Sequence, residues 1–290
     1  ILSLESHAQE NSTQTSAYEI SGYFDAYYQF NQTAQGRSPS ISVGRVFDQN
    51  ANAFQLSLVE VGVQRSTERF KFRIEIAAGQ TVDQLAGGVD ANAEGTRSFP
   101  QAFVVFTPES LKRLSVTVGK FYTHLGFETT KAKDNAQYSR SLLFNYAIPF
   151  WHQGIAVSYK MVPDKLTTSL YVVNGWDGRS NSEKNKSVTL GGNVGFESSS
   201  AFRWNYNFIV GPETESATDY RQAHELNGKL NLKSNVELAA DLVYGSQSRA
   251  LQEQEAKWRA IALYVNWKVT DTFKTCTRYE FFDDSDAGFA

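Results

Sequence analysis

The chain has 290 residues, a formal net charge of −3 and a mean hydropathy of −0.40. Without a basic block there is no sign of a nucleic-acid partner, and no stretch approaches the ~18 consecutive apolar residues of a membrane-spanning helix. The single cysteine, Cys276, excludes an intrachain disulfide and argues against a cysteine metal cluster.

The first residues resemble the end of an export signal. Ser6 and Ala8 are small residues at the −3 and −1 places of a signal-peptidase site, and they follow the apolar residues 1–4. We predict a signal-peptide remnant in residues 1–8 and a flexible N-terminus up to residue 16. An ordinary flexible N-terminus is the alternative.

From residue 17 onward, apolar and polar residues alternate with a period of two, which is typical of strands with one apolar face. In residues 70–78, Phe70, Phe72, Ile74, Ile76 and Ala78 face one way, and Lys71, Arg73 and Glu75 face the other. The pattern predicts thirteen strands, at residues 17–31, 54–65, 70–79, 99–107, 114–123, 153–162, 166–174, 187–197, 201–210, 222–232, 236–246, 257–269 and 272–282.

The connections alternate between short and long. The short ones are residues 66–69, 163–165, 198–200, 234–235 and 270–271, and the longer polar ones are 31–53, 80–98, 124–150, 175–186, 211–221 and 246–256. This places all long loops at one end of an antiparallel sheet, as in outer-membrane barrels. We therefore predict an all-β, transmembrane, antiparallel up-and-down barrel over residues 17–290.

Aromatic residues gather at the strand ends. Phe70, Phe196, Phe202, Trp267 and Phe273 lie at short turns, and Phe30, Phe54, Tyr244 and Phe281 lie near long loops. Such belts are expected at the two membrane interfaces. A soluble β-sandwich also alternates, but it rarely has such aromatic-rich ends or thirteen long strands.

In a membrane barrel the apolar face meets lipid and the polar face lines a water-filled lumen, because unpaired charges need water. We therefore predict a wet pore. The predicted lining residues are Asp25, Lys71, Arg73, Glu75, Arg203, Asn205, Asn207, Glu237, Asp241, Lys274, Arg278 and Glu280.

The long loop 124–150 is rich in apolar and aromatic residues, so it is expected to pack against something. If it enters the barrel, His124, Glu128 and Arg140 become candidates for a charged constriction. Packing over the rim is an equally open alternative.

The segment from Gly119 to Asp177 resembles the OmpL-like β-barrel porin-2 family of bacterial outer-membrane proteins. The resemblance rests on Gly119-Lys120-Phe121, Thr123-His124, Gly126, Glu128, Ser139-Arg140-Ser141, Phe144-Asn145-Tyr146, Pro149-Phe150, His152, Gly154 and Asn174-Gly175-Trp176-Asp177. Ser21-Gly22-Tyr23 and Asp25 to Tyr28 look like the family's first strand, and Arg278-Tyr279-Glu280 with Phe282-Asp283-Asp284 looks like a late one. The resemblance implies a Gram-negative outer-membrane channel of about sixteen strands, but it supplies no substrate.

We predict passive diffusion of small hydrophilic solutes or ions, with membrane lipids as partners, no nucleic acid and no cofactor. A homotrimer is compatible with this class. The alternatives are an adhesin or structural anchor, and a barrel hydrolase that pairs His124 with Ser139 or Ser141. A metal site from His124, Glu128 and His152 lacks any HExxH or CxxC spacing. We therefore expect no catalytic and no metal-binding residues.

Thirteen is an odd number, whereas bacterial single-chain barrels have an even number of strands. We therefore expect about three further strands after residue 290, which would close a sixteen-stranded barrel.

Overall fold

A computed structural model describes residues 18–32, 45–86, 96–176, 186–199, 201–213, 218–251 and 254–285. The expected export-signal remnant lies outside these residues. The chain divides into two compact units, residues 1–122 and 123–290. Within the described ranges, no helix combines the length and the apolar character that a membrane crossing requires.

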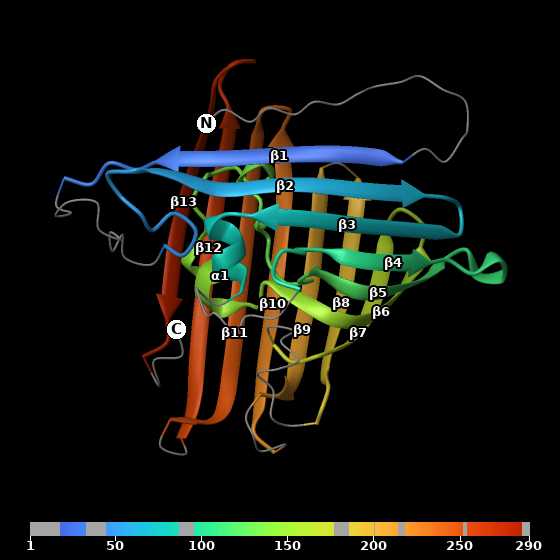
Figure 1. The fold of residues 1–290 in the computed structure, drawn as a ribbon. Coiled ribbons are helices and arrows are strands. Elements are labelled where there is room, and N and C mark those ends of the chain that lie inside the picture. The colour runs from blue at the N-terminus through green and yellow to red at the C-terminus, as the bar shows by residue number, and fades with distance from the viewer. Residues whose placement is uncertain are drawn as a thin grey trace. The chain divides into compact units, whose positions relative to one another are not determined.

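The thirteen predicted strands are all present, and they follow one another in the sheet in chain order (Figure 1). Within each unit, the strand pairs are antiparallel. The predicted up-and-down topology is therefore confirmed. The three further strands expected after residue 290 stay a prediction.

The described part of unit 1 contains five strands, one short helix and one 3-10 turn. These are β1 (Glu19–Tyr28), β2 (Phe54–Ser66), β3 (Phe70–Ala78), α1 (Gln80–Leu85), β4 (Ala102–Phe106), η1 (Glu109–Leu111) and β5 (Leu114–Tyr122). The sequence suggested only a polar connection at 80–98, yet α1 forms there. It buries Val82 against Tyr23, Leu58 and Ala77, so apolar burial and not helix propensity explains this short helix.

Unit 2 begins with the long loop, which carries the short helical segments η2 (Ala132–Asp134) and η3 (Leu143–Ala147). Its strands are β6 (Trp151–Val162), β7 (Leu166–Val173), β8 (Thr189–Ser199), β9 (Phe202–Pro212), β10 (Tyr220–Lys233), β11 (Val236–Leu251), β12 (Gln254–Lys268) and β13 (Lys274–Asp283).

Several predicted strand boundaries are wrong. Residues 246–256 were expected to form a loop, but β11 continues to Leu251 and β12 begins at Gln254. The ladder extends because Gln247 pairs with Ala256, and both side chains are buried. Strand β4 is also shorter than the expected 99–107.

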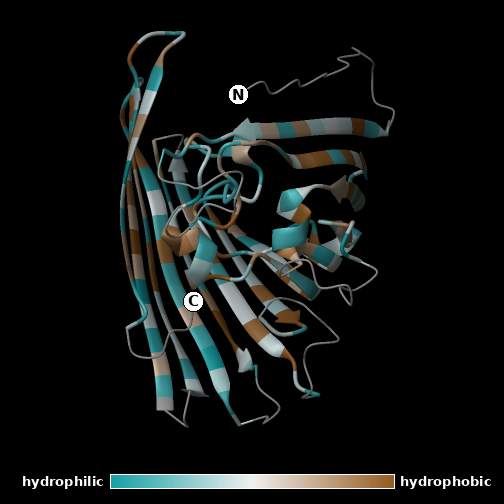
Figure 2. Ribbon diagram, turned by 60° about the vertical axis from the view of Figure 1, so that its left-hand side comes forward, coloured by the Kyte–Doolittle hydropathy of each residue, from teal (hydrophilic) through white to brown (hydrophobic). Residues whose placement is uncertain are grey.

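The two faces of each strand differ in polarity, as the alternating bands along the strands in Figure 2 show. On the apolar face of unit 2, large apolar side chains are exposed to the surroundings of the sheet, including Leu226, Leu242, Leu263 and Tyr279. Most of the aromatic rings expected at the membrane interfaces are exposed too, including Phe202, Trp267, Phe273, Tyr244 and Phe281. Phe196 is only partly exposed. An apolar surface of this kind calls for a lipid environment.

Candidate functional site: a long loop bound to the polar wall

In unit 2, the loop of residues 123–150 lies against the polar face of the strands. Several of its apolar side chains are almost fully covered, since Leu125, Leu143, Phe144 and Ile148 are each at most 4% exposed. The loop is held by four groups of contacts, which come from β7 to β13. The expectation that this segment packs against the barrel wall is consistent with these contacts.

The first contact is made by His124, directly after β5. Its ring stacks on Tyr171 of β7 with a centroid distance of 4.0 Å. Its Nε2 lies 2.9 Å from the carbonyl oxygen of Phe208 in β9, and since a carbonyl only accepts, Nε2 carries the proton. Burial lowers the pKa of His124 to about 4, because a desolvated imidazole disfavours its charged form.

A glycine makes room for this ring. A Cβ on Gly191 of β8 would lie 2.8 Å from Cε1 of His124. Since real Cβ atoms do not approach other atoms so closely, only glycine fits beneath the imidazole. Gly191 therefore leaves the space in the wall that the His124 ring occupies.

The second contact joins two wall carboxylates to the loop backbone. The amide of Gly126 donates to Glu225 of β10 at 2.7 Å, and the amide of Phe127 donates to Asp241 of β11 at 3.0 Å. Both carboxylates are only 1% exposed. Hydrogen bonds from backbone amides to buried carboxylates are among the stronger ones, so these two residues fix the first turn of the loop.

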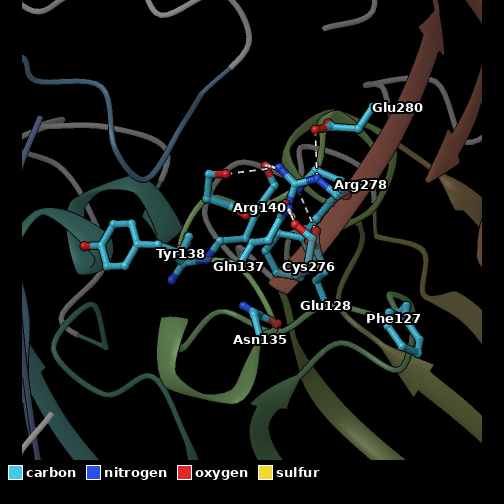
Figure 3. A network of polar contacts seen from close by, with 12 residues as sticks. Phe127, Glu128, Asn135, Gln137, Tyr138, Arg140, Cys276, Arg278 and Glu280 are labelled. Carbon is cyan, nitrogen blue, oxygen red and sulfur yellow. Dashed lines mark hydrogen bonds and ion pairs between the residues drawn. The ribbon is translucent and has the colours of Figure 1, made fainter. Parts of the chain in front are cut away.

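The third contact is made by Arg278 of β13 (Figure 3). Its guanidinium pairs with Glu128 at 2.8 Å and donates to the carbonyl oxygen of Ser139 at 2.6 Å. It also binds Glu280 at 2.8 Å. The other carboxylate oxygen of Glu280 accepts the amide of Leu142 at 2.6 Å. Strand β13 thus binds the first part of the loop at Glu128 and its later part at Ser139 and Leu142.

The fourth contact is made by Trp258 of β12, which is fully buried. Its indole N–H donates to the carbonyl oxygen of Ala147 at 3.1 Å. Its ring meets Trp176 edge-on, with centroids 5.9 Å apart. A Cβ on Gly245 of β11 would lie 2.1 Å from the indole, so this position also requires glycine.

Arg140 lies inside the loop and not at its surface. The side chain is 1% exposed, and it donates to the carbonyl oxygens of Thr130 and Tyr138. Glu128 accepts the amide of Ser141 at 2.6 Å as well as the Arg278 pair. Two charged side chains thus lie inside the loop, where Arg140 donates to backbone carbonyl groups and Glu128 accepts a backbone amide.

Below the loop, the wall carries a connected polar network. Asn207 donates to Glu225 at 2.8 Å, and Asn205 donates to Asn227 at 3.1 Å. The Lys229 ammonium pairs with Glu237 at 2.6 Å. This network leaves two cavities toward the short turns, of about 350 Å³ and about 640 Å³. The larger one contains Lys274, Glu237 and Cys276 among its lining residues.

The four candidate pore residues of unit 1 occupy one face of β1 and β3. Asp25 and Glu75 are buried, at 5% and 0% exposure. Arg73 pairs with Glu75 at 2.5 Å, and Lys71 is partly exposed. Whether they line a pore stays a prediction.

The rival chemistries find no support in the local geometry. His124 and His152 are neighbours, with ring centroids 5.4 Å apart, but Glu128 pairs with Arg278 instead of joining them. Ser139 binds Arg278, and the Ser141 hydroxyl accepts the amide of Phe144. Over the described ranges, no three His, Cys, Asp or Glu side chains gather in a way that could hold a metal.

Sequence reasoning missed three residues that hold the loop, namely Trp258, Tyr171 and Gly191. Trp258 carries a usable signal, because it shares a parity with Ala256, Ala260, Ala262 and Tyr264 of β12, all of which are buried. Large aromatic side chains on the polar parity of a barrel strand indicate that something covers that face.

The family comparison agrees with this arrangement. The family model described as "Putative beta-barrel porin-2, OmpL-like" matches residues 17–290. Among curated proteins, a search finds no match.

Two solved structures share the fold. The chain is similar to Salmonella typhi OmpF in complex with daunomycin, with 13% identity and a TM-score of 0.60 over 91% of this chain and 78% of that one. It is also similar to the outer membrane channel DcaP of Acinetobacter baumannii, with 11% identity and a TM-score of 0.56 over 96% of this chain and 82% of that one. With its thirteen-stranded meander and a family match over nearly its whole length, the chain belongs to the OmpL-like β-barrel porin-2 family of outer-membrane channels.

Proposed function

We propose that residues 123–150 narrow the water-filled lumen of a channel through which small hydrophilic solutes or ions diffuse passively. The observation that carries this proposal is the binding of Arg278 to both Glu128 and Ser139 of the loop. The four groups of contacts between the loop and the polar wall support a position of the loop inside the lumen over a position on the rim alone.

The proposed pore lining divides into two groups in unit 2. Asp241, Arg278 and Glu280 contact the loop directly, and Asn207 donates to Glu225, which holds Gly126 of the loop. Arg203, Asn205, Glu237 and Lys274 lie below the loop, where water reaches them. Asp25, Lys71, Arg73 and Glu75 form the corresponding proposed lining in unit 1.

The test of the constriction is to release the loop by Arg278→Ala. The exposed fractions of the paired Arg278 and Glu128 side chains are only 2% and 5%, and removing one partner of a buried ion pair costs about 3–5 kcal/mol. Single-channel conductance in planar bilayers should therefore rise, with larger current fluctuations. The matched control is Arg259→Ala, because Arg259 is 67% exposed and makes an ion pair with Asp283. Its conductance should stay at the wild-type value.

A cross-link supplies the reverse experiment. Gln137 of the loop donates to the carbonyl oxygen of the native Cys276 at 3.1 Å. In a Gln137→Cys, Arg278→Ala variant, a short bifunctional maleimide should tie the loop to β13 and restore the low conductance. The same variant with Cys276→Ser should not respond. If Arg278→Ala leaves the conductance unchanged while proteases cleave the released loop, the loop does not narrow the pore.

Three finer expectations also remain proposals: export through a cleaved signal peptide, assembly as a homotrimer, and the lack of enzymatic activity. The outer-membrane class of the family supports export, and its channel class supports the lack of enzymatic activity, since porins act by passage and not by chemistry.

A further inference from the structure

The polar wall of unit 2 buries carboxylates near the loop and exposes several cations toward the short turns. The carboxylates near the loop are buried: Glu225 and Asp241 are 1% exposed and Glu128 is 7% exposed. Each accepts hydrogen bonds from loop amides or from Arg278. Because these carboxylates are covered and already hydrogen-bonded or ion-paired, they contribute little to the field that a solute in water meets.

Several basic residues of the same face are exposed, whereas Arg278 is buried and Lys229 is paired with Glu237. Lys160 of β6, Arg203 of β9 and Lys274 of β13 are all exposed, and they line the two cavities between the loop and the short turns. Arg203 lies at the foot of the loop, with its guanidinium carbon 5.9 Å from the centre of the Phe127 ring. These cations therefore stand where a solute would approach the loop.

Cations outnumber carboxylates in both cavities. Lys160, Lys165 and Arg203 stand against Asp164 and Glu197 in the smaller cavity, and Lys233, Lys268 and Lys274 stand against Glu237 in the larger one. Glu237 is already paired with Lys229. Lys268 is paired with Asp271 of the adjacent turn. The residues that line the two cavities therefore carry a net positive formal charge.

We propose that this surface is a cationic vestibule that selects small anionic solutes carrying carboxylate or phosphate groups. The inference rests on the proposed function, since it requires the polar face to be water-filled. A wall of one sign concentrates counter-ions and sets ion preference. Arg203 adds a planar donor fork that matches carboxylate and phosphate oxygens.

The test is the reversal potential of single channels under a KCl gradient. The wild-type protein should favour chloride over potassium. The triple variant Lys160→Gln, Arg203→Gln, Lys274→Gln should shift the reversal potential toward the potassium equilibrium value. Arg259→Gln removes one positive charge on the apolar-face parity of β12, and it should cause no shift. Correct insertion is checked by the heat-dependent gel mobility of folded barrels.

Two further arms identify the origin of the preference. At about 1 M salt the Debye length falls to ~3 Å, so a preference that arises from charge should shrink there. Inorganic phosphate added at the short-turn side should reduce the chloride current of the wild type more than that of the triple variant.

A wild type that favours potassium, or a triple variant with an unshifted reversal potential, overturns the vestibule. The loop proposal fails separately, when Arg278→Ala leaves the conductance unchanged while the reversal potential still responds to the triple variant.

Discussion

At the residue scale, the lowered pKa of His124 makes the binding of the loop depend on pH. Its neutral ring is held by the Phe208 carbonyl group and the face of Tyr171, and its pKa of about 4 lies below the ordinary value of 6.5. A released loop therefore binds a proton between these two values, whereas the bound loop does not. Loop binding should be strongest above about pH 6.5 and should weaken as the pH falls toward 4.

We predict that open-channel current fluctuations increase as the pH falls through this range. In His124→Gln the side-chain amide can still donate to Phe208 but cannot titrate, so the pH dependence should flatten. His152 and the wall carboxylates remain in both proteins, and the difference between the two therefore isolates His124. Identical pH profiles would remove His124 from the response.

The sequence predicted which loop residues have a special role, but not the residues that they contact. His124, Glu128 and Arg140 were selected as loop residues with a special role, and the structure brings Glu128 and Arg140 into one buried network. Their partners could not be predicted, because Arg278 is 150 positions from Glu128 and Glu225 is 99 from Gly126. Local pattern does not encode contacts at such separation.

At the scale of elements, the strands were predictable and the loop path was not. Strands follow from period-two alternation, which each segment carries within itself. The bounds of β11 and β12 differed because a polar ladder continues past the apolar band, where alternation fades. The loop takes its path from wall residues on several strands, so its course depends on the assembled sheet.

The contact between β8 and the loop leads to a prediction at this scale. Gly191→Ala places a methyl group 2.8 Å from the His124 ring, and overpacking of this kind typically costs about 1–3 kcal/mol. Amides at the start of the loop should exchange with deuterium faster than in the wild type. The control is Gly22→Ala in β1, where a Cβ meets nothing within 4 Å. Slow exchange in both variants would show that the ring position is not needed.

For the whole molecule, the apolar face has to meet lipid. Leu242 of β11 and Leu232 of β10 are 40% and 54% exposed, but Leu232 lies next to a short turn. A charged residue on the lipid face costs about 2–4 kcal/mol near the membrane centre and about 0–1 kcal/mol near its interfaces. Leu242→Arg should therefore lower the stability of the folded protein in vesicles much more than Leu232→Arg.

Urea titration of the protein folded into lipid vesicles measures this difference. The free energies of unfolding of the two variants are compared with that of the wild type. Equal and small losses for both variants would contradict the assignment of this face to lipid.

The attachment of the loop to β13 also orders the events of assembly. Glu128 and Ser139 are synthesised long before Arg278. More than half of unit 2 must therefore follow the loop before its contacts with Arg278 can form. Contacts between residues so distant in sequence close late in folding. Until β13 pairs with β12, the loop lacks its contacts with Arg278 and Glu280, and Glu128 lacks its ion-pair partner. The channel therefore acquires its final bore only at the end of the process.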